Sequence, residues 1–505
     1  MKLLFTISTL LLLLSSHTFA QKQTNIWYYQ NGEGLDFSNG NPTVLTNGSI
    51  PYCEGSAAIS DTTGQLQFYT DGVTIWDQTH SPMPNGANLS GSNSSTQSAI
   101  IIPQPKHSDL YYIFTTDQAC GPKGFRYTKV DMSLNSNKGD VMPNYKNVPL
   151  LPITFEKVAA VHHCNGEDIW VIAIDANTGD FYTWLVTAKG LCNCPIITQT
   201  GPVHTQGYAC MKFSNNGKKL VVAESGGICG FSSIHTDLYT FDNNTGIPSF
   251  QQTIDTAIYN NSSSGGSFWG ASFSPNNQIL YLSTGFLRYN GSAGLAPGTA
   301  VVQYDLNASN IENSAVLLFV NTIPQNGCGA PTGSLQLGPD GRIYAGNACG
   351  MDVIEHPDSL GLACNYHYQA IPNTNGSGYG ITNFIESYLG QGVSACDHII
   401  SDSMCNWIRQ INCFTTSTSE GSSETEVKIF PNPFEQSATL TFPNSLQENI
   451  TITLHDMQGK LVWKRENINA AKITLQRDDL KHGMYLLHIL QAQSLRYSGK
   501  IIVEK

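Results

Sequence analysis

The chain has 505 residues, which is enough for two to four domains at roughly 100–200 residues each. Its 26 Lys and Arg residues against 38 Asp and Glu give a net charge of −12, which argues against a nucleic-acid partner. The 40% of hydrophobic residues argue against disorder over most of the chain. Together with 46 glycines and many Asn, Ser and Thr residues, this composition predicts an all-β protein.

The N-terminus predicts a secretory signal peptide over residues 1–20. Lys2 is followed by an apolar run over residues 3–14, and Thr18 and Ala20 place small residues at the −3 and −1 positions of a cleavage site. An N-terminal membrane anchor is the alternative, but it needs roughly 18–20 apolar residues. We therefore expect cleavage after Ala20 and no transmembrane span in the mature chain.

All 13 cysteines lie between the signal peptide and residue 414. Export permits disulfides, and the odd number leaves at least one thiol free or paired between chains. One group of Cys and His residues could instead bind a metal ion: His162, His163, Cys164, Cys192 and Cys194. Because export favours disulfides, we expect no metal there. Residues 393–413, which contain Cys396, Cys405 and Cys413, predict a stapled segment that closes the large domain.

Polar hairpin turns between apolar strands recur through residues 25–390. Turns such as Asn216-Gly217 and Asp340-Gly341 suit the positive φ of tight hairpins. A second strand pair follows most of these hairpins, and four strands in a unit of about 45–65 residues is typical of a β-propeller blade. Six such turns can be located, at Gly64, Asp109, Gly166, Gly217, Asn277 and Gly341.

The two ends of this region predict a further blade. Strands over 25–29 and 379–385 have no hairpin partner of their own, and pairing them in one blade would close the ring and remove exposed edges. We predict about seven blades over residues 21–392, with six or eight as alternatives. Patterns such as Ser274–Tyr281 resemble WD40-like and YVTN-type propeller repeats, and this resemblance implies the fold but no chemistry.

The last 79 residues form a separate predicted domain. Residues 414–426 contain almost no apolar side chains and predict a flexible linker. From residue 427 onward there are ten Lys and Arg against seven Asp and Glu, and no cysteine, unlike the acidic, cysteine-rich body. Short alternating strands with polar turns predict that residues 427–505 fold as a small Ig-like β-sandwich.

Four motifs in this tail resemble the type A C-terminal sorting domain of the type IX secretion system of Bacteroidetes-type bacteria. They are Phe430–Pro433, Leu454–Lys460, Leu480–Tyr485 and Lys500–Lys505. The residues that carry the resemblance are Pro431, Asn432, Pro433, Asp456, Gly459, Lys460, Gly483, Tyr485 and Lys500. An ordinary Ig-like accessory domain is the alternative, in which Gly459 and Gly483 only form turns.

This resemblance implies a route and a set of partners. The chain would enter the periplasm, cross the outer membrane through the type IX secretion machinery and lose its tail to a surface sortase. It would then be attached to lipopolysaccharide or released. We therefore expect a secreted or outer-cell-surface protein.

No catalytic residue or cofactor site is predicted. Glycosidases need two carboxylates at a fixed separation. Five carboxylates near inner strands could meet at the channel mouth, but we expect them to satisfy turns and blade contacts: Asp71, Asp117, Glu156, Asp175 and Glu224. Long loops over 80–97 and 284–300 are rich in Asn, Ser, Gly and aromatic residues, which suits glycans or protein surfaces. The sequence predicts a binding or adhesion protein, with a hydrolase or lyase acting on polysaccharide as the alternative.

Overall fold

The structure is a computed structural model that describes residues 22–504 except 52, 193, 206, 226–234, 255–266, 292–293, 322–332, 348–349, 373–379, 391, 397–426, 443, 445–446, 448, 457–460 and 492–493. The predicted signal peptide and linker lie outside the described residues, as do Cys229, Cys328, Cys349, Cys405 and Cys413. The chain divides into two compact units, Met1–Ile408 and Arg409–Lys505.

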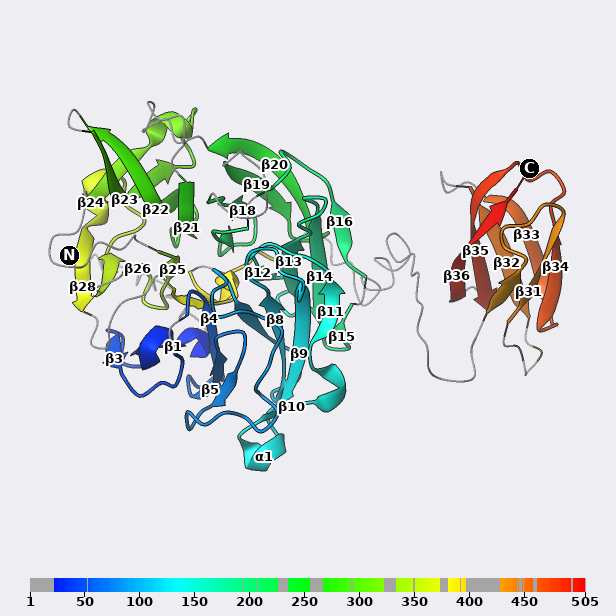
Figure 1. The fold of residues 1–505 in the computed structure, drawn as a ribbon, viewed down its shortest axis with the longest axis horizontal. Helices are drawn as coiled ribbons and strands as arrows, with labels where there is room; N and C mark the ends of the chain where they lie inside the picture. Colours follow the sequence, from blue (N-terminus) through cyan, green and yellow to red (C-terminus); the bar gives the residue numbers. More distant parts are fainter. Residues whose placement is uncertain are drawn as a thin grey trace, which may run out of the picture. The chain divides into compact units, whose positions relative to one another are not determined.

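The first unit contains seven sheets that stand around a ring as the blades of a β-propeller (Figure 1). The predicted fold and blade number are therefore confirmed for the described part of the chain. The first, second and third blades contain β1 (Ile26–Tyr28), β2 (Gly34–Asp36), β3 (Thr43–Leu45); β4 (Ser56–Ser60), β5 (Leu66–Thr70), β6 (Ile75–Asp77); and β7 (Ala99–Pro103), β8 (Leu110–Thr116), β9 (Phe125–Asp131), β10 (Asp140–Val141), β11 (Val148–Leu151).

The other four blades follow in chain order. They contain β12 (Ala159–His162), β13 (Ile169–Ile174), β14 (Phe181–Thr187), β15 (Gly190–Leu191), β16 (Ile196–Thr198); β17 (Met211–Phe213), β18 (Lys219–Val222), β19 (Thr236–Asp242), β20 (Ile247–Ile254); β21 (Ser267–Phe273), β22 (Ile279–Gly291), β23 (Gly294–Asp305), β24 (Val316–Asn321); and β25 (Leu335–Leu337), β26 (Ile343–Asn347), β27 (Gly350–Ile354), β28 (Tyr366–Pro372). The described helices are short: η1 (Lys22–Thr24), η2 (Gln30–Gly32), α1 (Leu134–Asn137), η3 (Pro143–Tyr145), η5 (Glu312–Ser314), η6 (Gly361–Cys364) and η7 (Glu386–Tyr388).

Burial between neighbouring blades explains the apolar strands. Every residue of β13 is buried, since both faces of its sheet are covered. The tight turns at the outer ends of these hairpins rely on residues that tolerate positive φ. Gly217 has φ +68°, and a Cβ atom there would lie 2.2 Å from the Asn243 side-chain nitrogen. The glycine expected from the sequence to adopt a positive φ in this hairpin turn therefore does so in the structure.

The segment that ends the propeller, residues 380–390, runs near the centre of the ring, where its ribbon is yellow (Figure 1). Its strand β29 (Thr382–Asn383) pairs in parallel with β4. The Asn383 side-chain amide donates to the carbonyl oxygens of Ala99 (3.2 Å) and Val158 (3.3 Å), in the third and fourth blades. Its oxygen accepts a hydrogen bond from Lys212 Nζ of the fifth blade at 3.3 Å. One buried side chain thus joins three blades at the axis.

The two ends of the propeller meet, but not by the expected pairing. We expected the strand over 379–385 to join residues 25–29 in one blade. Instead β1 pairs with β2, and β29 pairs with β4 of the second blade. The ends touch through side chains, because the rings of Trp27 and Phe384 lie 5.5 Å apart. The segment completes the second blade, because β29 is the edge strand of the four-stranded sheet β29-β4-β5-β6, and from there Asn383 also reaches neighbouring blades.

A disulfide ties the closing segment to the body. Cys396 is bonded to Cys164 in the fourth blade, with their Cα atoms 5.0 Å apart. Cys120, Cys192 and Cys194 are also disulfide-bonded. Three described cysteines are free and buried: Cys53, Cys210 and Cys364.

The second unit is a β-sandwich that fits the predicted Ig-like fold. Its two sheets have the strand orders β30-β31-β34 and β33-β32-β35-β36. Apolar residues from both sheets share one core, and β31 alternates half-buried and buried side chains as predicted. The strands are β30 (Lys428–Phe430), β31 (Ser437–Thr441), β32 (Ile450–His455), β33 (Leu461–Ile468), β34 (Lys472–Gln476), β35 (Gly483–Gln491) and β36 (Ser494–Val503).

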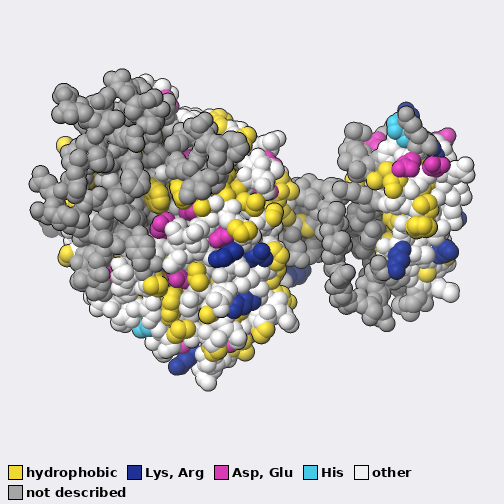
Figure 2. Space-filling model, viewed as in Figure 1, with side chains coloured by type: hydrophobic (Ala, Val, Ile, Leu, Met, Phe, Trp, Pro, Cys, Tyr) yellow, Lys and Arg dark blue, Asp and Glu magenta, His cyan; other side chains and the backbone are white. Residues whose placement is uncertain are grey.

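The visible surface agrees with the acidic, weakly charged composition. On the face of the first unit shown in Figure 2, the described Lys and Arg side chains are few and mixed with polar and apolar ones. Within the described ranges, every helix is too short or too polar to cross a bilayer.

Candidate functional site

A group of ionisable side chains gathers at one end of the fifth blade. We call it the His–carboxylate cluster, and it comprises His204, Glu224, His235, Asp237 and Tyr239. His204 lies in the link between β16 and β17, and Glu224 follows β18. Asp237 and Tyr239 are two residues apart on β19, so the pleat places them on the same face of the sheet. The strand order thus brings five polar side chains from three segments to one point.

The distances within the His–carboxylate cluster are short. His204 Nδ1 lies 3.0 Å from Glu224 Oε1, and His204 Nε2 lies 2.8 Å from the Tyr239 hydroxyl. His235 Nδ1 lies 2.9 Å from Asp237 Oδ2, and its Nε2 lies 3.5 Å from Glu224 Oε2. The side chains of His204, Glu224 and Asp237 are 0% exposed, whereas His235 is 13% exposed and opens the cluster to the surface.

The buried charges of the cluster shift one another's ionisation. Burial by itself would raise the pKa of Glu224, but its hydrogen bond with His204 and the charges of nearby basic groups lower that pKa. Burial would likewise lower the pKa of His235, but Asp237 and Glu224 raise it. Burial and the Asp237 carboxylate raise the pKa of the Tyr239 hydroxyl. The lowered pKa favours an ionised Glu224 beside the two imidazole rings.

Two other carboxylates, Glu54 and Glu156, lie near each other close to the axis. Glu156 is fully buried and accepts hydrogen bonds from the Thr96 and Ala119 backbone N–H groups, at 2.8 and 2.7 Å. The half-buried Glu54 accepts one from Ser94 Oγ at 3.2 Å. Burial, with the nearby Glu156, raises the pKa of Glu54 to about 7. Glu156 is therefore locked into backbone contacts, while Glu54 keeps access to solvent.

The other carboxylates considered in the sequence do not converge on a site. Asp71 accepts the backbone N–H groups of Val73 and Thr74, and Asp117 accepts that of Lys123. Asp175 accepts the N–H of Asn177 in a turn. These groups satisfy local backbone, as expected. Glu224 also accepts a backbone N–H, that of Thr205 at 3.0 Å, but it differs in contacting two histidines that carry no recognisable spacing in the sequence.

The Cys and His residues weighed as metal ligands are used in other ways. Cys164 is in a disulfide, so it offers no thiolate ligand. His162 Nδ1 lies 2.7 Å from Ser387 Oγ of the axial segment, and His163 Nε2 lies 3.2 Å from the Asn244 carbonyl oxygen. Burial lowers the pKa of His162 to about 4. These two imidazoles link one end of the fourth blade to the axial segment and to the β19–β20 turn of the fifth blade.

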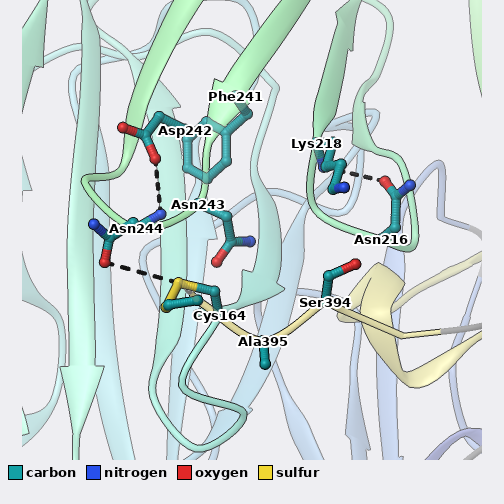
Figure 3. A pocket seen from close by; sticks show the side chains of 10 residues that line it. Cys164, Asn216, Lys218, Phe241, Asp242, Asn243, Asn244, Ser394 and Ala395 are labelled. Atoms are coloured by element: carbon teal, nitrogen blue, oxygen red, sulfur yellow. Dashed lines mark hydrogen bonds between the residues drawn. A yellow bond between two sulfur atoms is a disulfide. The ribbon is translucent and has the colours of Figure 1, made fainter. Parts of the chain in front are cut away.

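A pocket of about 500 Å³ opens at the opposite end of the fifth blade (Figure 3). Two turns of that blade and the disulfide-tied segment surround it, and amide side chains dominate its polar lining. In the β19–β20 turn, Asp242 accepts the backbone N–H of Asn244 at 3.0 Å, and the Asn244 side-chain oxygen lies 3.9 Å from the Cys164 sulfur (Figure 3). The lining residues are Cys164, Asn216, Lys218, Phe241, Asp242, Asn243, Asn244, Ser394, Ala395 and Cys396.

Some of the predicted sorting residues come together in the second unit. Asn432 lies between Pro431 and Pro433, and its side-chain oxygen accepts the backbone N–H of Ile502 on β36 at 2.8 Å. Asp456 directly follows β32, and Lys500 lies on β36 opposite Leu486. Gly483 begins β35 with φ +150°, and the buried Tyr485 donates its hydroxyl to the Lys481 carbonyl oxygen at 2.7 Å. Gly459 and Lys460 lie outside the described residues.

Comparison with known proteins identifies the second unit. Residues 428–504 match the model of the secretion system C-terminal sorting domain family. This match, together with the tail motifs, makes the second unit a type IX sorting domain and indicates secretion to the cell surface or the extracellular space. A search of curated proteins found no match.

Solved structures similar to the chain are distant in sequence. One is the Niastella koreensis GH74 enzyme, with 10% identity and TM-score 0.38, covering 95% of this chain and 65% of that one. Another is a quinonprotein alcohol dehydrogenase-like protein from Bacteroides thetaiotaomicron, with 13% identity, TM-score 0.36 and coverage of 72% and 78%. A third is the Pseudomonas aeruginosa periplasmic gluconolactonase, with 13% identity, TM-score 0.34 and coverage of 90% and 98%.

Proposed function

We propose that the protein is an exported β-propeller that binds an extracellular glycan or protein, and that the type IX machinery delivers it by recognising residues 428–504. A surface sortase then removes the tail, and the propeller is attached to lipopolysaccharide or released. The match of the tail to the sorting-domain family supports the delivery. The binding role rests on the arrangement of polar groups in the first unit.

The burial of Glu156 is the observation that favours a binding protein over a glycoside hydrolase. A glycosidase needs two carboxyl groups that face the scissile bond. Glu54 could serve as an acid because its pKa is about 7. Its neighbour Glu156 is 0% exposed and bound to two backbone N–H groups. The pair therefore lacks a second carboxylate that a sugar could reach.

The pocket in Figure 3 is the best-supported binding site. Asn side chains offer both a donor and an acceptor, which suits sugar hydroxyls and peptide groups. The exposed Lys218 adds a positive charge beside them. A pocket of about 500 Å³ is in the size range of small-ligand sites.

A matched pair of variants tests this proposal. Asn244 and Asn177 occupy equivalent positions, since each donates its backbone N–H to the Asp two residues earlier, at 3.0 and 2.8 Å. Only Asn244 lines the pocket. We expect Asn244→Ala to weaken ligand binding about tenfold, the size of one lost hydrogen bond, with Asn177→Ala unchanged. The measurement is a glycan array with the full chain, followed by titration calorimetry with each hit.

Two outcomes would contradict it. Equal binding by the Asn244→Ala and Asn177→Ala variants would move the site elsewhere. Turnover of a polysaccharide that is abolished in Glu54→Gln would instead support the hydrolase alternative, for which the raised pKa of Glu54 is the favouring observation.

A further inference from the structure

We propose that the His–carboxylate cluster is a binding site for one divalent transition metal ion of the zinc type, with His204, His235 and Asp237 as ligands. The site lies at the end of the fifth blade opposite the pocket in Figure 3, so it does not depend on the proposed binding function. Its ligands come from the link before β17 and from the start of β19.

The ligand atoms are already close to the spacing that such an ion needs. One atom from each of the three side chains lies within 4.8 Å of the others. Asp237 Oδ2 is 3.9 Å from His204 Nε2 and 2.9 Å from His235 Nδ1. In a tetrahedral site with bonds of about 2.0–2.1 Å, ligand atoms lie roughly 3.3 Å apart. The two separations that involve Asp237 therefore lie within about 0.6 Å of this value.

The geometry at His235 Nδ1 also supports a metal site. His235 Nδ1 is buried and makes no hydrogen bond of normal geometry to any residue in the described part of the chain. The Asp237 carboxylate oxygen is only 2.9 Å away, so distance is not the reason. The Asp237 carboxylate is therefore an ion-pair partner of this nitrogen, and an ion between the imidazole and the carboxylate would bind both groups.

Glu224 contacts the ring nitrogens of His204 and His235 that would not bind the ion. It lies 3.0 Å from His204 Nδ1 and 3.5 Å from His235 Nε2. In metal sites, a carboxylate that binds the distal N–H of a ligating histidine fixes the ring and its tautomer. Here one carboxylate would fix both rings, which directs His204 Nε2 and His235 Nδ1 toward Asp237.

The remaining groups fit the same assignment. The Tyr239 hydroxyl is 2.8 Å from His204 Nε2 and 3.3 Å from Asp237 Oδ2, so it can offer a fourth oxygen or hold a water there. A dication would also offset two carboxylates whose side chains are 0% exposed. Two imidazole nitrogens select zinc and its neighbours over calcium or magnesium, which prefer oxygen.

Metal binding to the full chain tests the proposal. Protein stripped with a chelator is loaded with Zn²⁺, desalted and analysed for metal by mass spectrometry. We expect one ion per chain, and an absorption spectrum typical of four-coordinate geometry when Co²⁺ replaces Zn²⁺. His235→Ala should bind none, and Glu224→Gln should bind 10–100-fold more weakly. His107→Ala, which changes an exposed histidine of the third blade, is the matched control and should bind one ion.

The wild-type Co²⁺ spectrum needs no variant and keeps the test decisive if His235→Ala fails to fold. Absence of stoichiometric metal in the wild-type chain would overturn the proposal and leave a network of histidine–carboxylate ion pairs. Loss of the ion in His107→Ala, or in a His163→Ala variant in the β12–β13 turn of the fourth blade, would overturn it as well.

Discussion

Glu54 and Glu156 illustrate how surroundings give the same side chain different roles. Both lie near the axis, yet Glu156 is held by backbone N–H groups and Glu54 faces partly outward. The sequence indicated that Glu156 satisfies a blade contact, because most such carboxylates do. It could not indicate His204 and His235, which lie in separate links and meet only after the fifth blade forms.

The raised pKa of Glu54 predicts a dependence of stability on pH. Its pKa in the folded chain is about 7, against an ordinary value of about 4.3. The folded chain therefore binds this proton more tightly, and the stabilisation is full below about pH 4.3 and is lost as pH rises through about 7. Because Gln cannot ionise, the free energy of unfolding of Glu54→Gln should rise relative to wild type between pH 4 and 8.

Denaturant unfolding at several pH values measures this difference. Glu167→Gln is the control, because Glu167 is an exposed partner of Lys106 and should give a curve parallel to wild type. Parallel curves for Glu54→Gln and wild type would contradict the assigned pKa.

At the scale of elements, the hairpins could be predicted and the axial segment could not. Turns such as Asn216-Gly217 carry their own signal, because positive φ selects Gly and Asn. The strand over 379–385 lacks such a local signal. Its position is set by the hydrogen bonds of Asn383 to several blades, and these carbonyl groups converge only in the closed ring.

The disulfide of the closing segment gives a prediction at the same scale. Cys164 and Cys396 join positions 232 residues apart and form part of the pocket wall. Replacing both by Ser should lower the free energy of unfolding of the first unit by roughly 2–5 kcal/mol, because the unfolded chain loses a constraint. It should also weaken ligand binding at the pocket.

Chemical unfolding of the double variant beside Cys364→Ser checks this expectation. Cys364 is a free, buried cysteine and should tolerate Ser with a smaller loss. An equal loss in both variants would show that sulfur burial, and not the cross-link, stabilises the unit.

At the scale of the whole molecule, the localisation was easier to predict than the ligand. Sorting motifs are short and ordered, and the family match covers residues 428–504 as the tail motifs indicated. Ligand recognition depends on turns brought together from different blades, as in the pocket where residues 164, 244 and 396 meet. Such a site leaves no contiguous pattern in the chain.

We propose that the second unit delivers the propeller to the outside of the cell. Cell fractionation measures this delivery most directly. Cells express either the full chain or a chain without residues 427–505, and an antibody to the propeller detects the protein in each fraction. We predict that the full chain reaches the cell surface or the medium and that the truncated chain accumulates in the periplasm. Appearance of the truncated propeller outside the cell at the full-length level would contradict the account.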